Sequence, residues 1–397
     1  MSTSASTTGQ TRCTIDSPVA REFTKWADNE CARSESGAVG MQLVLYRHGV
    51  CLGSIEVGTD GLGRALSVDD YSLLRCSICK PLCAIAIAEL VLQGKVSYDT
   101  TLNEIFGRKV ASFSGELQLE QLLLHTSGLH TLKGFDMNII PVEKRKWLAL
   151  HSRPAKGWRI GIDHRYSDSM NGILVGLILE EITGDSYTSI FHRILSELGV
   201  DKGQFFFEMD RDEYSLIQHR LQVGSIHDLE QMFPSLLDRT YEMTSEWNPS
   251  WGGTGSIRGL AQFYDRILAV QKSTGEAHNL RAAVDLALQH VPRAPGAKGY
   301  AYGQEQSRGF TIDLAGFLGL QHEHAPLMVG HFGYGTSVGL SDSKSQLAVA
   351  AKFSGNGGKF GERVRQWMNV LRFVDNVANE NSIKKSTPFD LSNSLGV

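Results

Sequence analysis

The sequence predicts an α+β fold, in which an antiparallel sheet is flanked by helices and a mainly helical lobe is inserted into the chain. Runs typical of strands occur near both ends, at 39–57 and at 327–353. The long middle of the chain carries helical patterns instead. Because strands from distant parts of a chain can pair in one sheet, the middle is interpreted as an insertion between the two halves of that sheet.

The composition is that of an ordinary globular protein. The chain has 397 residues, of which 42% are hydrophobic and 21% charged, and this length allows one large unit or two lobes. A net charge of −4 with scattered Lys and Arg predicts no nucleic-acid partner. Residues 1–10 lack the basic and apolar regions of a secretory signal, so we expect a cytoplasmic protein without membrane contact.

The N-terminal part is expected to contain a disordered segment, a helix and a hairpin. Residues 1–15 are polar and predicted to be disordered, and 17–35 carry a helical pattern. Two β-rich runs follow, at 39–46 and 50–57, and Arg47-His48-Gly49 between them favours a tight turn.

The next helix is predicted to lie in the protein interior. The run from Ile78 to Leu92 is apolar nearly all round, and a helix without a polar face belongs in a core. Gly94 can end it, and Pro81 fits only its first turn. The run is shorter than the roughly 20 apolar residues that a bilayer requires.

The remaining elements are predicted from apolar periodicity and capping residues. We expect helices at 119–124, 173–182, 187–198, 260–270, 282–290 and 360–377, the third and fourth capped by Asp185 and Ser256, and strands at 309–320, 327–329 and 347–353. The sheet lobe is therefore assigned to 16–75 and 253–380, the helical lobe to 76–252 and a tail to 381–397, with one catalytic unit in all.

Ser77 and Lys80 form a candidate catalytic pair at the start of the buried helix. Their spacing of three residues allows the hydroxyl and the amine to meet. A serine needs an adjacent base to become a nucleophile, and a lysine shielded from water can serve. The same spacing recurs in polar surroundings at 341–344 and 382–385. A buried serine beside a lysine that extends its amine to solvent is the structural alternative.

Cysteine and histidine clusters leave a metal site as a second possibility. Cys76, Cys79 and Cys83 share one helix face, but no fourth ligand is near, and free cysteine packs as a small hydrophobic residue. His322 and His324 likewise lack a third ligand. Without export features, all six cysteines are expected to be reduced thiols. We expect no metal and no cofactor.

A competing nucleophile motif occurs near the C-terminus. Gly335 to Gly339 matches the G-x-S-x-G elbow of α/β-hydrolases. That fold requires its catalytic histidine after the serine, and no histidine follows His331. We therefore interpret Ser337 as part of a structural turn.

Five segments together resemble the serine β-lactamase and penicillin-binding-protein superfamily, closest to its class C and esterase-like branch. They are Ser77-Ile78-Cys79-Lys80, Leu119 to Leu129, Tyr166-Ser167-Asp168 with the helix up to Gly184, Gly253 to Phe263, and His331-Phe332-Gly333, in the order that the family has. The resemblance covers 38–378 and implies a β-lactamase/transpeptidase-like fold.

The resemblance also implies the roles of the site residues. Ser77 would be the nucleophile and Lys80 the base or its proton partner. Tyr166 would be a second base that later protonates the leaving group, and an ammonium beside a phenol favours loss of the phenolic proton. The backbone N–H groups of Ser77 and Tyr334 would form the oxyanion hole, in the substrate-binding turn that contains Gly333.

Two positions of the resemblance concern substrate binding. His331 would hold the acyl or carboxylate side of the substrate and orient Tyr166, or else be a strand-end histidine with an ordinary hydrogen bond. Asp168 stands where the family usually has Asn, and an ionised carboxylate cannot donate a hydrogen bond. Its charge would keep Lys80 protonated and favour substrates with an amine or amide N–H.

The sequence therefore predicts an intracellular serine hydrolase or acyltransferase. It would act on an ester or amide of a small molecule through an acyl-serine intermediate, and specialised metabolism is the setting that we expect. A β-lactamase or a D-amino-acid peptidase is one alternative. A non-catalytic binding or scaffold relative of the same fold is the other. The acyl donor, the acceptor and the oligomeric state are left open.

Overall fold

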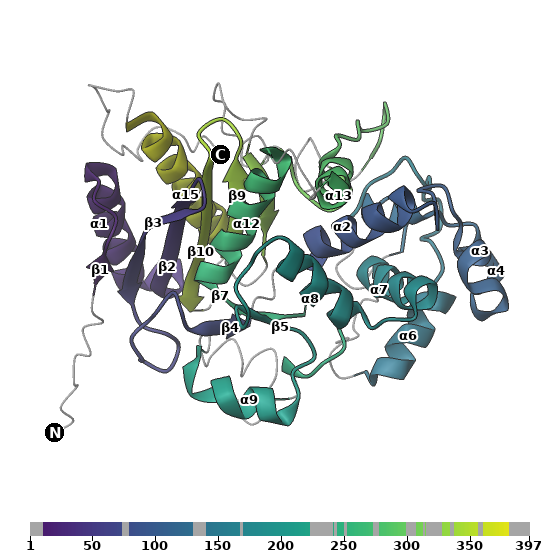
Figure 1. Ribbon diagram of the computed structural model, residues 1–397, viewed down its shortest axis with the longest axis horizontal. Coiled ribbons are helices and arrows are strands. Elements are labelled where there is room, and N and C mark those ends of the chain that lie inside the picture. Colours follow the sequence, from purple (N-terminus) through teal and green to yellow (C-terminus); the bar gives the residue numbers. More distant parts are fainter. Residues whose placement is uncertain are drawn as a thin grey trace.

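A computed structural model of the chain describes its structure at residues 11–73, 79–129, 140–166, 170–222, 241, 244–249, 252–272, 278–298, 307–312, 314, 328–333, 337–355 and 360–380. Among the predicted site residues, Ser77, Asp168 and Tyr334 lie outside these ranges. The strands gather at one end of the molecule and most of the short helices at the other (Figure 1).

The main sheet has six antiparallel strands and joins the two ends of the chain. Its strands, in spatial order, are β1 (Arg12–Cys13), β3 (Val50–Gly58), β2 (Ala38–Arg47), β10 (Leu347–Gly355), β9 (Ser337–Asp342) and β8 (Met328–Phe332). β2 pairs with β10 along its whole length, from Arg47 opposite Leu347 to Ala38 opposite Gly355. This pairing confirms the predicted α+β fold, in which strands from the two ends of the chain share one antiparallel sheet.

The N-terminal hairpin forms as the sequence predicts. Arg47 pairs with Val50, so His48 and Gly49 alone make the turn. Both have positive φ, 53° and 81°, as the two-residue turn with the correct twist for a hairpin requires. Glycine adopts this conformation without steric cost.

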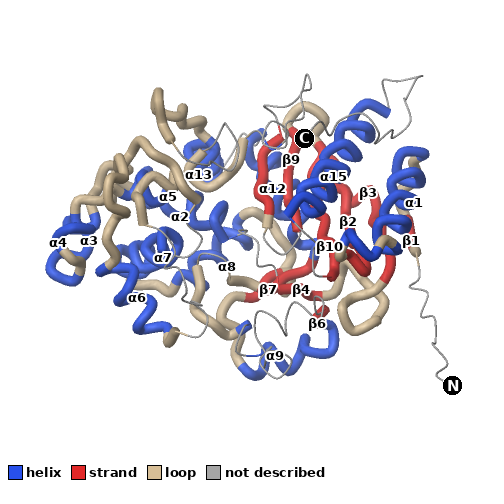
Figure 2. Tube along the Cα trace, turned by 180° about the vertical axis from the view of Figure 1, so that it is seen from behind, coloured by secondary structure: helices blue, strands red, loops and turns tan. Residues whose placement is uncertain are grey.

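Twelve helices of the described chain complete the fold. They are α1 (Pro18–Ala32), α2 (Cys79–Leu92), α3 (Leu102–Phe106), α4 (Ser112–Gly115), α5 (Leu119–Leu123), α6 (Val142–His151), α7 (Met170–Thr183), α8 (Tyr187–Glu197), α9 (Arg211–Ile217), α12 (Ile257–Lys272), α13 (His278–Leu288) and α15 (Phe360–Glu380). α1 and α15 lie on one face of the main sheet and α12 on the other (Figures 1 and 2).

The alternation of side chains along each strand creates two cores. Leu43 and Val349 face α1 and α15, where they join Phe23 and Phe373 in one hydrophobic cluster. Neighbouring residues in sequence, such as Val44, point to the other face and join the cluster that contains α2, α7, α8 and α12. The sheet therefore supports the helical part of the molecule directly.

α2 is buried nearly all round, as its sequence predicts. Eleven of its fourteen residues are buried, and α7, α8 and α13 pack against it. Gly94 follows its end with a φ of 68°, and the Lys95 N–H donates to the Leu90 carbonyl, which closes the last turn. The burial of this helix fixes where its first residues emerge.

A second, small sheet lies between the main sheet and the helices. It contains β5 (Phe205–Phe206), β7 (Thr254–Ser256), β4 (Tyr71–Leu73) and β6 (Leu221–Gln222), in this order. These strands are two or three residues long, and the sequence does not predict them. Runs this short carry no periodicity, and they form because partners from distant parts of the chain meet here.

Three local expectations are wrong. The predicted disorder of 1–15 fails at Arg12 and Cys13, because β1 pairs with β3 and the neighbouring Ile15 packs into the core. Ser186, not Asp185, caps α8, since its hydroxyl accepts the Ser189 N–H. The expected strand at 309–320 is not formed in its described residues.

At that segment the structure has a single bridge instead of a strand. Thr311 exchanges two backbone hydrogen bonds of 2.9 Å with Gly330, and Leu314 is helical. The bridge places the residues before Thr311 beside β8, at the edge of the main sheet.

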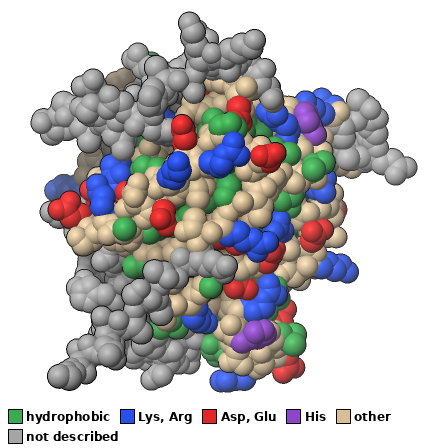
Figure 3. Space-filling model, turned by 90° about the vertical axis from the view of Figure 1, so that its left-hand side faces the viewer, with side chains coloured by type: hydrophobic (Ala, Val, Ile, Leu, Met, Phe, Trp, Pro, Cys, Tyr) green, Lys and Arg blue, Asp and Glu red, His purple; other side chains and the backbone are tan. Residues whose placement is uncertain are grey.

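The surface is of mixed charge on the face shown in Figure 3, where Lys and Arg are interspersed with Asp and Glu. Within the described ranges, no helix has both the length and the hydrophobicity that crossing a bilayer would take. The intracellular location expected from the sequence stays a prediction.

Glu30 provides a test of how α1 is attached to α15. Its side chain is 2% exposed, pairs with Arg365 and accepts a 3.2 Å hydrogen bond from Gln366. Glu30→Ala leaves these groups without their buried acceptor, so we expect the free energy of unfolding to fall by about 3 kcal/mol. Urea unfolding measures the loss. Glu22→Ala, an exposed position on the same helix, should change the free energy by less than about 0.5 kcal/mol; equal losses would contradict the prediction.

Candidate active site

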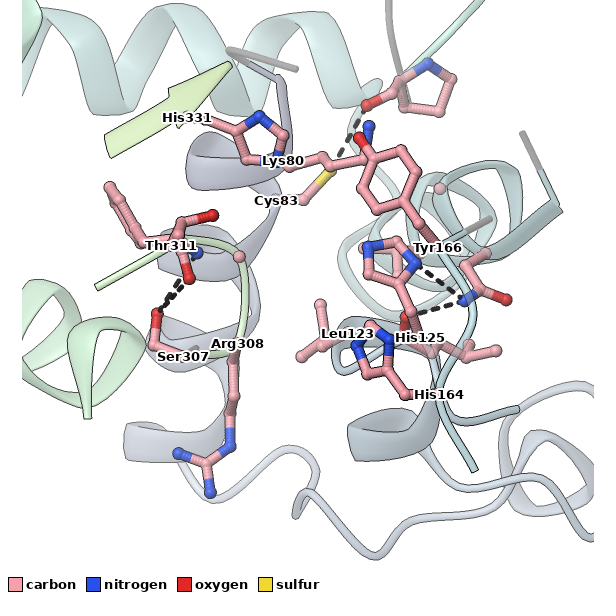
Figure 4. Close-up of a pocket in the computed structure, with 17 residues that line it drawn as sticks. Lys80, Cys83, Leu123, His125, His164, Tyr166, Ser307, Arg308, Thr311 and His331 are labelled. Atoms are coloured by element: carbon pink, nitrogen blue, oxygen red, sulfur yellow. Dashed lines mark hydrogen bonds between the residues drawn. The ribbon is translucent and has the colours of Figure 1, made fainter. Parts of the chain in front are cut away.

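A cavity of about 590 Å³, its open mouth included, lies where the main sheet meets the helical part. Its walls come from α2, α5, α7, the segment 307–311 and the end of β8. Figure 4 shows Lys80, Tyr166 and His331 together at one end and Arg308 at the other. Three predicted site residues thus line one cavity, although the chain separates the first from the last by 251 positions.

Lys80 enters the cavity from the first turn of α2. Its side chain is buried, with 8% exposure, and its Nζ lies 4.8 Å from the centre of the Tyr166 ring. This is within the range of a cation–π contact, which stabilises an ammonium away from water. Tyr166 is partly exposed and comes from the loop that precedes α7. An amine and a phenol therefore meet in the cavity, and the amine belongs to the residue three positions after Ser77 in the chain.

His331 reaches the same place from β8. Its ring centre is 6.1 Å from that of Tyr166. Its Nδ1 lies 2.6 Å from the Phe332 carbonyl, and because a carbonyl only accepts, Nδ1 must carry the proton. Burial, and after it the charge of Lys80, lowers the pKa of His331 to about 3. A neutral imidazole can form hydrogen bonds with a substrate but gives no charge to a carboxylate.

Gly333 follows β8 in the turn toward β9. Its N–H donates to the Ser337 carbonyl at 2.8 Å, and it does not line the cavity. The expected oxyanion donors, the N–H groups of Ser77 and Tyr334, lie outside the described residues. The part of the turn that the structure describes is therefore held by the β8–β9 ladder.

Residues 26–371 of the chain match the family model named Beta-lactamase. The chain belongs to this family. A search of curated proteins finds no match.

Solved structures show the Beta-lactamase-family fold over most of the chain. A family VIII carboxylesterase is 20% identical, with a TM-score of 0.66 over 92% of this chain and 100% of that chain. A penicillin-binding protein homologue from Caulobacter crescentus is 18% identical, with a TM-score of 0.65 over 89% and 96%. EstCE1, described as a hydrolase with promiscuous acyltransferase activity, is 16% identical, with a TM-score of 0.65 over 90% and 98%.

These likenesses establish a fold that serine hydrolases use. At identities of 20% and below they do not select among esterase, amidase and acyltransferase chemistry. The Beta-lactamase family match and the fold confirm the resemblance seen in the sequence.

The cysteines considered as metal ligands are packing residues where the structure describes them. Cys79 and Cys83 are buried, and their thiols donate to the Gly252 and Pro249 carbonyls at 2.8 and 3.5 Å. Burial raises the pKa of Cys83 to about 12, as suits a packing residue. In the ranges that the structure covers, His, Cys, Asp and Glu form no group of three that could hold a metal ion. Cys76, His322 and His324 lie outside those ranges.

Ser337 is not in a turn, as the sequence suggested, but begins β9. It pairs with Lys352 of β10 and is 1% exposed. The strand forms because β9 fills the gap between β8 and β10 in the sheet. A nucleophile elbow instead requires a sharp strand-to-helix turn that exposes the serine. Ser337 is buried within a strand and therefore does not form such an elbow.

The sequence analysis missed a buried histidine, a partly buried histidine and a buried asparagine in the cavity wall. His125, His164 and Asn171 all line it. His125 lies in the segment Leu119 to Leu129 that carries the family resemblance, and its φ of 57° is unusual for a non-glycine residue. That segment was the available signal. Nothing in the sequence shows that Asn171 would contact His125.

The segment 307–311 forms the wall opposite His125, and Arg308 and Gly309 fix its position in addition to the bridge at Thr311. The Arg308 guanidinium bonds Glu120 at 2.6 and 2.9 Å and lies 3.9 Å above the Tyr98 ring. Gly309 lies against α2, where an added Cβ would come within 2.8 Å of the Lys80 carbonyl oxygen and 2.5 Å of the Ala84 Cβ. The glycine allows this wall to approach the backbone that carries Lys80.

Gly309→Ala should move this wall away from α2. A methyl group in contact with backbone cannot be accommodated by a side-chain rotation, so we expect a loss of about 1–3 kcal/mol in the free energy of unfolding and a reduced turnover of ester substrates. Thermal unfolding and ester hydrolysis measure the two effects. Gly361→Ala, where the added Cβ meets nothing within 4 Å, is the matched control. Equal behaviour of the two variants would contradict the close approach.

The low pKa of His331 predicts a dependence of stability on pH. The unfolded chain has an ordinary histidine pKa of about 6.5, so between pH 6.5 and about 3 it binds more protons than the folded chain. The free energy of unfolding therefore falls as the pH drops through this window. Urea unfolding at pH 7 and pH 5 should show a loss about 2 kcal/mol smaller in His331→Gln than in the wild type. The same loss in both proteins would show that His331 is not held neutral.

Proposed function

We propose that this chain is a serine hydrolase or acyltransferase that forms an acyl-enzyme on Ser77 with an ester or amide of a small molecule. One observation carries the proposal. The Lys80 ammonium lies 4.8 Å over the Tyr166 ring in a cavity wall, three residues after Ser77 in the chain. In this arrangement the Tyr166 oxygen, beside the positive charge of Lys80, can accept the proton of a serine hydroxyl.

The reaction would proceed in two acyl-transfer steps. The Ser77 hydroxyl gives its proton to Tyr166, whose phenolate is favoured by the positive charge of Lys80, and its oxygen attacks the substrate carbonyl. The tetrahedral intermediate collapses when Tyr166 returns the proton to the leaving alcohol or amine. Water or a second alcohol or amine then attacks the acyl-enzyme and gives its proton to Tyr166. The second tetrahedral intermediate collapses as Tyr166 returns that proton to the Ser77 oxygen, which restores the free serine and the phenolate. Hydrolysis and transfer differ only in this acceptor.

The walls of the cavity favour an uncharged acyl group. Leu122, Leu123, Val175 and Phe310 give it apolar surface. Of the cationic side chains that line it among the described residues, Lys80 contacts Tyr166, and Arg308 is bound by Glu120. His331 is neutral, for the reasons given above. With Arg308 paired and His331 neutral, a free substrate carboxylate is not required, which favours an ester or amide over the carboxylate-bearing substrates of cell-wall peptidases.

Covalent labelling tests the proposed function. We expect a fluorophosphonate or penicillin probe to add to Ser77, located by mass mapping, and no adduct in Ser77→Ala. Lys80→Met and Tyr166→Phe should lower kcat/KM for a nitrophenyl ester by about 10²–10⁴, because each removes a proton carrier. Lys344→Met, which alters the lysine of another S-x-x-K match, should behave as the wild type. If neither probe reacts and simple esters are not turned over, the non-catalytic alternative is correct.

A further inference from the structure

Asn171, on the first turn of α7, is fixed by three hydrogen bonds in the cavity wall. Its Nδ2 donates to the Leu122 carbonyl at 3.0 Å, and its Oδ1 accepts from the Ser127 hydroxyl at 2.8 Å. The side chain is 2% exposed. Because the Leu122 carbonyl can only accept, the amide nitrogen must face it, and the orientation of the amide is determined.

The same amide nitrogen determines the tautomer of His125. Nδ2 of Asn171 lies 3.3 Å from Nδ1 of His125, and an amide nitrogen only donates. Nδ1 of His125 must therefore be the acceptor, and the neutral ring carries its proton on Nε2. A proton on Nδ1 would set two N–H groups against each other. This geometry alone disfavours the imidazolium.

His125 lies in contact with the proposed proton carrier. Its ring centre is 4.5 Å from that of Tyr166, at an interplanar angle of 45°. Figure 4 shows the His125 and Tyr166 rings next to each other. Lys80 and His125 therefore both lie against the Tyr166 ring.

The protonation state of His125 affects Lys80 and Tyr166, because several titratable groups face its ring. Among the described residues, Lys80 of α2, His331 of β8, and His164 and Tyr166 of the loop before α7 face it. Burial, followed by Lys80, His164 and His331, holds the pKa of His125 well below its usual value. An imidazolium here would place a second cation beside the Lys80 ammonium, and its charge would shift the protonation equilibrium of the Tyr166 phenol.

We infer that Asn171 and His125 are positioning residues for Tyr166: the amide of Asn171 holds His125 as the neutral Nε2–H tautomer, and the His125 ring fixes the phenol of Tyr166 beside Lys80. The inference rests on the proposed function, in which Tyr166 carries the proton between Ser77 and the leaving group. It assigns a role to two residues that do not touch the reacting atoms.

Kinetics test the positioning role. Asn171→Leu keeps the volume of the side chain but removes the donor to Nδ1, and His125→Asn keeps a residue that tolerates the φ of 57° but removes the ring. Each should lower kcat for ester hydrolysis about tenfold or more while KM changes less than about threefold, because Tyr166 acts in the transition state. The double variant should lose no more than the stronger single variant. His151→Gln, a partly exposed position at the end of α6 outside the cavity wall, should match the wild type.

A spectroscopic readout separates this inference from the proposed function. ¹⁵N NMR of labelled histidine, with His125 assigned by its loss in His125→Asn, should show the Nε2–H tautomer unchanged from pH 8 to pH 5. Asn171→Asp replaces the donor by an acceptor and should produce a protonated His125 at pH 7.

The outcomes are distinguishable. Ester turnover with a His125 that titrates near pH 6.5, carries its proton on Nδ1, or can be replaced without loss of kcat overturns the inference and leaves the proposed function intact. An absence of turnover and of probe labelling in the wild type refutes the proposed function, and the positioning role is then refuted with it, whatever the tautomer.

Discussion

The burial of α2 is the constraint on which the rest of the site depends. This helix has no polar face, so α7, α8 and α13 must enclose it, and its start is held at the boundary between the main sheet and the helices. Lys80 is carried into a wall where its amine is largely shielded from water. Desolvation of an amine is costly, and the Tyr166 ring 4.8 Å away offsets part of that cost. The same contact that stabilises the fold brings an amine and a phenol together.

The electrostatics of the cavity follow from a single strong charge among neutral rings. His125 and His331 both lie close to Lys80, and each has its tautomer set by a group that can only donate or only accept. Two further cations beside Lys80 would repel its ammonium, so keeping these rings neutral protects the state of Lys80 and Tyr166.

The cavity also depends on contacts between parts of the chain that are far apart in sequence. Arg308 is held by Glu120 and Tyr98, and Gly309 permits close contact with α2. Thr311 is tied to Gly330 of the sheet edge. A wall fixed at three points keeps its distance from the opposite side, where His125 and Tyr166 lie. Pre-organised geometry of this kind reduces the reorganisation that a reaction would otherwise require.

The sequence by itself determined the elements whose signals are local. The run that forms α2, the His48-Gly49 turn and the ordered motifs of the Beta-lactamase family are all readable in it, because periodicity, turn conformation and motif spacing involve neighbouring residues. Only the tertiary structure decided the tautomers of His125 and His331, the strand position of Ser337 and the bridge at Thr311. Each of these depends on a hydrogen-bond partner supplied by chain packing, and the amide that sets His125 comes from a separate helix, 46 positions further along the chain.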